Sequence, residues 1–265
     1  MNEKISNVGE PQSLEQLKST AQDMGEAARE MFSGKTHESS VGQLYAETAA
    51  LFAEVIKAKL PPRDMPYEML DVGSFKGDLV ANVVKEVGDD YHFAITGIDV
   101  NREALQQNQA VRTKVTADIS AMPFVDRQFD VTEARYVLVW NKPEKQEQIL
   151  REINRVTSGF SILQHAGADN TDTSAWQHNI HALLSGGVPK LQRQECYFSS
   201  ADEIEQWMIQ NGIQFKRIQH RKVDKVSSVF IEKFKLSEEE TKATHQILGD
   251  KDYIYQTTWI IGEAA

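Results

Sequence analysis

Three aspartates lie near strand ends, beside a glycine-rich turn. Asp71 closes a short apolar strand, Asp99 ends a predicted strand over 93–99, and Asp118 follows a shorter one over 111–117. Because parallel strands bring their carboxyl ends to one edge of a sheet, we expect these carboxylates to share a crevice. Asp71 at the mouth favours a cationic ligand, and Asp99 is placed to accept both hydroxyls of a ribose. The alternative role for Asp71 and Asp99 is to cap the following helices.

The turn after Asp71 is defined by Gly73 and Gly77, and apolar residues at helical spacing follow over 79–87. Strand, glycine turn and helix open a doubly wound α/β domain. A dinucleotide fingerprint fits poorly, because its second and third glycines would be Phe75 and Asp78. A diphosphate also requires a helix N-terminus without a neighbouring anion.

The segment Asp71-Val72-Gly73-Ser74-Phe75-Lys76-Gly77 resembles the D-x-G-x-G-x-G signature of class I S-adenosylmethionine-dependent methyltransferases. Phe75 stands where that signature has its middle glycine. A second run over 117–130, A-D-I-S-x-M-P-F-x-D-x-x-F-D, is similar to the pattern of small-molecule methyltransferases. The resemblance covers about residues 40–262.

The resemblance implies that S-adenosylmethionine is the cofactor. It implies that Asp99 holds the ribose, that Asp118 meets the adenine amino group with Ile119 beside the ring, and that Ala134-Arg135 lies near the methionine end. The expected cofactor-binding residues are Asp71, Gly73, Ser74, Phe75, Gly77, Asp99, Val100, Asp118, Ile119, Ala134 and Arg135.

Candidates for the acceptor side are fewer. His165 follows the fifth predicted strand, and an imidazole suits deprotonation of an acceptor hydroxyl near neutral pH. A hydrogen-bonded loop histidine without a catalytic role is the alternative. Tyr45, Trp140 and Trp176 are expected to line the acceptor pocket, although Tyr45 and Trp140 are also placed to pack against other residues. No metal site is expected, because His178 and the histidine three residues later have no third ligand at a diagnostic spacing.

Composition limits the partners. The net charge of −10 argues against nucleic acid, and no segment is long and apolar enough to span a bilayer. The only cysteine, Cys196, fits a reducing cytosol, so we expect a cytoplasmic protein. The sequence leaves a homodimer open.

Periodicity predicts a doubly wound, Rossmann-like seven-stranded sheet, mostly parallel, and the resemblance implies that the last strand inserts antiparallel between the fifth and sixth. We expect a flexible tail over 1–12, a helical lid over 13–62 and the α/β domain over 63–265, with insertions at 166–198 and 224–250. Asn101, Asn141 and Ser200 are predicted helix caps, and Pro143 a first helical residue.

The predicted function is methyl transfer from S-adenosylmethionine to an oxygen, nitrogen or carbon atom of a small molecule. Phe75 favours one alternative, a scaffold or regulator that binds the cofactor without transferring methyl groups. A nicotinamide-dependent oxidoreductase is a third hypothesis, and the glycine pattern that it needs is missing.

Overall fold

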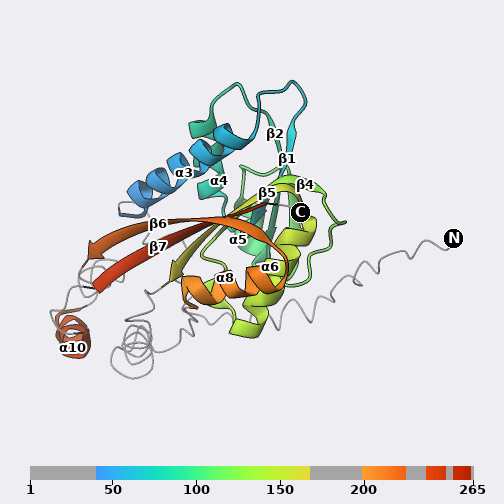
Figure 1. Ribbon diagram of the computed structural model, residues 1–265. Helices are drawn as coiled ribbons and strands as arrows, with labels where there is room; N and C mark the ends of the chain where they lie inside the picture. The colour runs from blue at the N-terminus through green and yellow to red at the C-terminus, as the bar shows by residue number, and fades with distance from the viewer. Residues whose placement is uncertain (1–39, 168–198, 225–236, 249–252, 264–265) are drawn as a thin grey trace.

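The computed structural model describes residues 40–167, 199–224, 237–248 and 253–263. Within these ranges, seven strands form one sheet in the order β3-β2-β1-β4-β5-β7-β6 (Figure 1). The strands are β1 (Tyr67–Val72), β2 (Phe93–Asp99), β3 (Thr113–Thr116), β4 (Phe129–Arg135), β5 (Thr157–Gly167), β6 (Gln214–Asp224) and β7 (Tyr253–Glu263). The first five strands pair parallel with one another, and β7 pairs antiparallel with β5 and β6. The predicted fold class is confirmed.

Helices pack on both faces of this sheet. The described helices are α3 (Ser40–Lys59), α4 (Asp78–Val87), α5 (Arg102–Gln107), the short 3-10 helix η1 (Leu138–Trp140), α6 (Pro143–Val156), α8 (Ala201–Gln210) and α10 (Glu238–Leu248). Helices α3 and α4 lie on one side of the sheet, α6 and α8 on the other, and α10 lies beyond the far ends of β6 and β7 (Figure 1).

Strand alternation divides the core into two layers. Met69, Val131 and Ile162 pack toward α3 and α4, whereas their neighbours Leu70 and Leu163 pack toward α6 and α8. Because side chains alternate along a strand, Asp71 and Glu133 must share the α3/α4 side with Met69 and Val131. Two acids are therefore built into one face of a hydrophobic sheet.

Two of the predicted caps are confirmed and one is wrong. The Asn101 side chain accepts a hydrogen bond from the Ala104 amide at 3.0 Å, and Ser200 forms a reciprocal capping box with the acid three residues on. Pro143 is the first residue of α6, but its cap position is Lys142. The side-chain amide of Asn141 instead donates to the Val137 carbonyl at 2.7 Å, which closes the turn of η1.

The segment expected to form a lid is partly described. From Thr48 onward, α3 contributes Ala49, Phe52 and Ile56 to the core layer that it shares with α4. Residues 13–39, most of the 166–198 insertion with Trp176, and the side chain of Tyr45 lie outside the described residues. The division into lid and domain therefore stays a prediction.

Candidate functional site

The strand order reverses between β1 and β4. These strands are neighbours, and the chain leaves β1 toward β2 on one side and β4 toward β5 on the other. Open α/β sheets bind their ligands at such a switch point, outside the carboxyl ends of the strands. The predicted aspartates and the glycine turn lie at this edge.

The turn after β1 requires its two glycines. Gly73 and Gly77 have φ angles of 72° and 79°, in the left-handed region. A Cβ at Gly73 would lie 2.4 Å from Val137 Cγ1, and one at Gly77 would lie 2.1 Å from Asn108 Oδ1. The amides of Gly73 and Ser74 both donate to the Ile98 carbonyl, at 2.9 and 3.1 Å, which ties the turn to the end of β2.

Phe75 adopts a left-handed backbone conformation that is unusual for a residue with a Cβ. Its φ is 45°, a conformation that costs a residue with a Cβ about 1–2 kcal/mol. In this conformation its amide donates to Asp99 Oδ2 at 2.9 Å. The ring is half-buried, with the Lys76 ammonium 5.7 Å from its centroid. The substitution therefore leaves the turn's main chain able to hold Asp99.

Main-chain donors fix the carboxylate of Asp99. Besides the Phe75 amide on Oδ2, the Asn101 amide donates to Oδ1 at 2.7 Å. Burial raises the pKa of Asp99, and these hydrogen bonds act against the rise. The Val100 amide also acts on this carboxylate, and a carboxylate offers about four lone-pair sites, so Asp99 keeps acceptor capacity for a ligand hydroxyl. Val100, which follows, is half-buried.

Asp71 ends a buried chain of hydrogen bonds. Asn108 Nδ2 donates to Ser74 Oγ at 2.8 Å, and that hydroxyl donates to Asp71 Oδ2 at 2.5 Å. Burial raises the pKa of Asp71 to about 7; the Ser74 hydrogen bond lowers it, and the charge of Asp99 raises it further. Sequence analysis missed Asn108, which follows α5 and carries no motif.

Glu133 is a further buried acid, and it was not predicted from the sequence. It pairs with Asp71 in the register of β1 and β4, and its residue is 0% exposed. Among the described residues, neither of its carboxylate oxygens has a hydrogen-bond partner. Burial raises the pKa of Glu133 well above its ordinary value; the charge of Asp71 adds to this rise, and Arg135 opposes it.

Asp118 lies in the loop after β3 with both carboxylate oxygens engaged. Oδ1 accepts from the amide and hydroxyl of Ser120 at 2.9 and 2.8 Å, and Oδ2 lies 2.7 Å from Lys145 Nζ. Burial raises the pKa of Asp118, but these partners outweigh it and hold that pKa below its ordinary value. Ile119 packs in the core layer beneath. Lys145, on α6, was not predicted.

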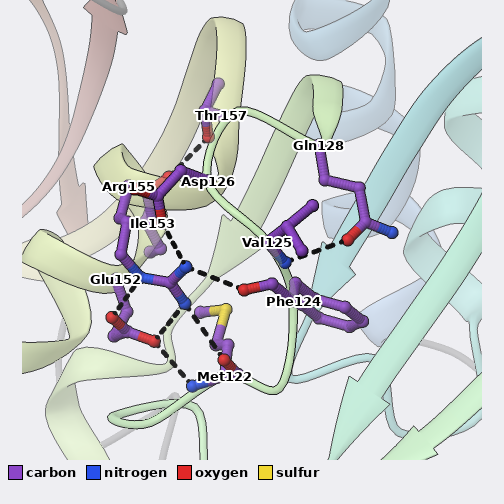
Figure 2. Close-up of polar contacts among 9 residues, drawn as sticks. All are labelled: Met122, Phe124, Val125, Asp126, Gln128, Glu152, Ile153, Arg155 and Thr157. Carbon is purple, nitrogen blue, oxygen red and sulfur yellow. Dashed lines mark hydrogen bonds and ion pairs between the residues drawn. The ribbon is translucent and has the colours of Figure 1, made fainter. Parts of the chain in front are cut away.

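Arg155 holds the chain that follows Asp118 (Figure 2). It donates to the carbonyls of Met122 and Phe124 at 3.0 and 2.7 Å and to Asp126 at 2.8 Å. It also forms a two-point pair with Glu152, which accepts the Met122 amide at 2.7 Å. The loop that carries Asp118 is thus fastened to α6.

The last two residues of β4 face opposite sides of the sheet. Ala134 is buried toward the α6/α8 layer. Arg135 Nε donates to Gln164 Oε1 at 2.9 Å, and its guanidinium lies 4.4 Å from the Tyr136 ring centroid. Trp140, in η1, is half-buried.

His165 does not join the carboxylate group. Its neighbour Gln164 contacts Thr48 of α3, whereas His165 Nε2 lies 2.7 Å from the Ser199 carbonyl, ahead of α8, so the two side chains leave opposite faces of β5. His165 is 0% exposed, and no described group bonds its Nδ1. Burial lowers the pKa of His165 to about 4, although the Ser199 carbonyl and Glu203 act to raise it.

Two features are absent from the described residues. These residues contain no group of three or more His, Cys, Asp or Glu side chains able to hold a metal ion. None of their helices combines the length and the hydropathy of a membrane-spanning segment.

Comparison with known proteins gives one family. Residues 64–228, more than half of the chain, match the family of methyltransferase domains. No curated protein matches the sequence.

Solved structures share the fold at low identity. YcgJ from Bacillus subtilis is 14% identical with a TM-score of 0.61, covering 82% of this chain and 98% of its own. Magnesium protoporphyrin IX methyltransferase from Synechocystis, solved with bound S-adenosylmethionine, is 10% identical with a TM-score of 0.55, covering 94% and 97%. Loganic acid methyltransferase, solved with S-adenosylhomocysteine, is 13% identical with a TM-score of 0.59, covering 88% and 98%.

Proposed function

The chain belongs to the family of methyltransferase domains, and we propose that it transfers the methyl group of S-adenosylmethionine to an oxygen, nitrogen or carbon atom of a small molecule. The observation that carries the proposal is the gathering of Asp71, Asp99 and Glu133 at the switch point of the sheet. Buried acids in that place suit a cofactor with an ammonium and a sulfonium, and they oppose a diphosphate.

The residues present fit this cofactor. Asp99 is held by main-chain amides with lone pairs left for the ribose hydroxyls, and the Gly73–Gly77 turn brings main chain to the crevice without side-chain bulk at its ends. Asp118 would face the adenine amino group, which would replace Lys145 Nζ as the partner of Oδ2. Two structural neighbours, solved with S-adenosylmethionine and S-adenosylhomocysteine, support the choice of ligand class.

When bound, S-adenosylmethionine supplies a methyl group that the sulfonium makes electrophilic. The task left to the chain is to align the acceptor with that group and to exclude water. We assign the acceptor side to Tyr45, Trp140 and Trp176, with residues 13–62 and 166–198 as its cover. The acidic net charge and the single cysteine support a small-molecule acceptor and a cytoplasmic location.

His165 stays our candidate base for an acceptor that must lose a proton, although its side chain leaves the face of β5 opposite Asp71 and is 0% exposed. With its Nε2 proton directed at Ser199, the imidazole keeps an unprotonated Nδ1 at neutral pH. A pKa of about 4 makes it a weak base, so its contribution is tied to acceptors with acidic protons. A His165→Gln variant that leaves the pH profile of kcat/KM unchanged would remove it from the reaction.

The test of the function is methyl transfer itself. Purified protein is incubated with methyl-labelled S-adenosylmethionine and pools of hydroxyl, amine and carbon acceptors, alongside Asp99→Ala and the exposed control Asp90→Ala. Label transfer by the wild type and the control, with loss in Asp99→Ala, supports the proposal. Tight cofactor binding with no transfer to any pool would overturn it and favour the scaffold or regulator.

A further inference from the structure

Arg135 is a cation held at the carboxyl end of β4. The residue is half-buried, and its Nε donates to Gln164 Oε1 at 2.9 Å. Gln164 is buried and donates in turn to Thr48 Oγ1 of α3 at 3.4 Å. The guanidinium also lies 4.4 Å from the ring centroid of Tyr136. A side chain that is held in this way loses less conformational entropy when it binds a ligand.

Arg135 lies on the other half of the sheet edge from the acids assigned to the cofactor. Asp71 and Asp99 belong to β1 and β2, whereas Gln164 is the register partner of Arg135 on β5, on the opposite side of β4. The Nε contact therefore directs Arg135 toward β5 and away from β1. Because these four strands are parallel, β4 and β5 end at the same edge as β1 and β2. This places Arg135 beside the cofactor's acids, on the side left for the acceptor.

The residue after Arg135 has an unusual backbone. Tyr136 has a φ of 54°, in the left-handed region, which costs a residue with a Cβ about 1–2 kcal/mol. Its amide donates to the Gln164 carbonyl at 2.9 Å. Gln164 thus holds Tyr136 by its main chain and Arg135 by its side chain. Strain of this kind clusters at ligand-binding sites, where it positions a side chain for function.

The groups that hold the guanidinium are uncharged. Gln164 offers an amide oxygen and Tyr136 a ring face. Glu133, two residues earlier on β4, feels the charge of Arg135, but burial raises the pKa of Glu133 well above its ordinary value and so favours its neutral form. These three residues therefore position a positive charge without supplying the anion that a guanidinium binds best.

We propose that Arg135 binds a carboxylate group of the acceptor, and that the acceptors are small organic acids with a hydroxyl or amino group to be methylated. The proposal rests on the proposed function, because it names the substrate class of the same site. An arginine whose Nε is engaged can still present its two terminal nitrogens to a carboxylate in two parallel hydrogen bonds. The hydroxyl or amino group gains the methyl group and loses a proton, S-adenosylmethionine leaves as S-adenosylhomocysteine, and the bound carboxylate is unchanged.

The test compares acids with their own amides. Full-length protein and methyl-labelled S-adenosylmethionine are incubated with matched pairs of hydroxy and amino acids and their amides, such as 4-hydroxybenzoate and 4-hydroxybenzamide. The ratio of kcat/KM for acid and amide is measured in wild type, Arg135→Gln, Arg135→Lys and the control Arg112→Gln; Arg112 is an exposed arginine ahead of β3. This ratio does not depend on the fraction of folded protein, so a destabilised variant still gives a valid comparison.

The cofactor's methionine part carries a carboxylate too, so its affinity is measured separately. Calorimetric titration of S-adenosylhomocysteine into the same four proteins gives that affinity. We expect it to change less than twofold in every variant, because Arg135 is directed away from β1.

We expect the wild type to prefer acids, and Arg135→Gln to lower the ratio of acid to amide roughly tenfold, because it removes a charge-assisted contact. Arg135→Lys should keep part of the preference, since it keeps the charge and loses the two-point geometry. Arg112→Gln should match the wild type, and the methylated products should retain their carboxylate.

The same ratio in wild type and Arg135→Gln would overturn the assignment of Arg135, and so would a methyl ester as the product. An unchanged ratio with a large loss of S-adenosylhomocysteine affinity in Arg135→Gln would overturn it in favour of the cofactor's carboxylate. If the cofactor binds and neither acids nor amides are methylated, the proposed function itself fails. The two failures are therefore distinguishable.

Discussion

Replacing Arg155 by methionine should lower the free energy of unfolding by about 2–4 kcal/mol. The side chain donates to two main-chain carbonyls, those of Met122 and Phe124, and pairs at two points with Glu152 (Figure 2). Hydrogen bonds to charged groups contribute roughly 1.5–3 kcal/mol each. Since 30% of the Arg155 side chain is exposed, water compensates for part of the lost hydrogen bonds. The expected loss of unfolding free energy is therefore smaller than the sum of their contributions.

The same helix supplies a matched control. Arg151 also lies on α6 and also pairs with a glutamate, Glu147, but 56% of its side chain is exposed. Exposed pairs of this kind contribute about 0–1 kcal/mol. Arg151→Met should therefore change the unfolding free energy far less than Arg155→Met.

Urea denaturation of the two variants measures the difference. Arg155→Met should also weaken cofactor binding severalfold, because the loop that Arg155 fastens carries Asp118. Equal effects of the two substitutions on stability would refute the assignment of Arg155 as the attachment of this loop. A large loss in Arg155→Met, with Arg151→Met near wild type, would support it.

Three further predictions concern the turn and the buried ionisable groups. Gly73→Ala should lower the free energy of unfolding by about 2–5 kcal/mol, because alanine is strained in the left-handed conformation and its Cβ would meet Val137 at 2.4 Å. Adding Val137→Ala should recover the steric part of this loss in urea denaturation. Strictly additive effects of the two substitutions would contradict the contact. His165 has a folded pKa of about 4 and an unfolded value near 6.5, so the unfolded state binds the proton and stability falls as pH drops through this window, by on the order of 3 kcal/mol. His165→Gln should flatten that fall, and an unchanged pH profile of the unfolding free energy would argue against a neutral buried imidazole. Glu133 has the opposite sign: its raised pKa makes the folded state retain a proton, so stability falls as pH rises above about 4.5. Glu133→Gln should therefore gain stability relative to wild type between pH 5 and pH 8, and a constant difference across that range would count against the raised pKa.

Local patterns were sufficient for the backbone of the site. The turn glycines, the strand ends and the acids that follow them are encoded within a few residues, so Asp71, Asp99 and Asp118 could be placed at one sheet edge before the structure was known. The antiparallel position of β7 came from the family resemblance, because pairing between distant strands leaves no mark in local periodicity.

The partners of these acids depend on contacts between distant segments. Lys145 reaches Asp118 from α6, and Asn108 reaches Ser74 from the end of α5. Glu133 sits in a Thr-Glu-Ala-Arg run with no apolar signal, and it is buried because the strand alternation turns it toward α3 and α4.

Two local rules also met competing interactions. Asn141 has the residue type of a helix cap, but its side-chain amide donates to the Val137 carbonyl in the turn of η1. Helix α6 therefore begins at Pro143 without a cap from Asn141. His165 lies at the predicted position along β5, yet the alternation of the strand directs it toward Ser199 and away from Asp71. A shift of one residue along a strand moves a side chain to the other face of the sheet. The position of His165 at the end of β5 therefore did not decide which face its side chain occupies.

The central claim is that the carboxyl edge of β1 and β2 binds S-adenosylmethionine. It is tested most directly by calorimetric titration of that cofactor into wild type, Asp99→Ala and Asp90→Ala, the last an exposed acid before the start of β2. Micromolar binding by wild type and Asp90→Ala, with loss in Asp99→Ala, is the predicted result. No binding by the wild type, or equal binding by all three proteins, would contradict it.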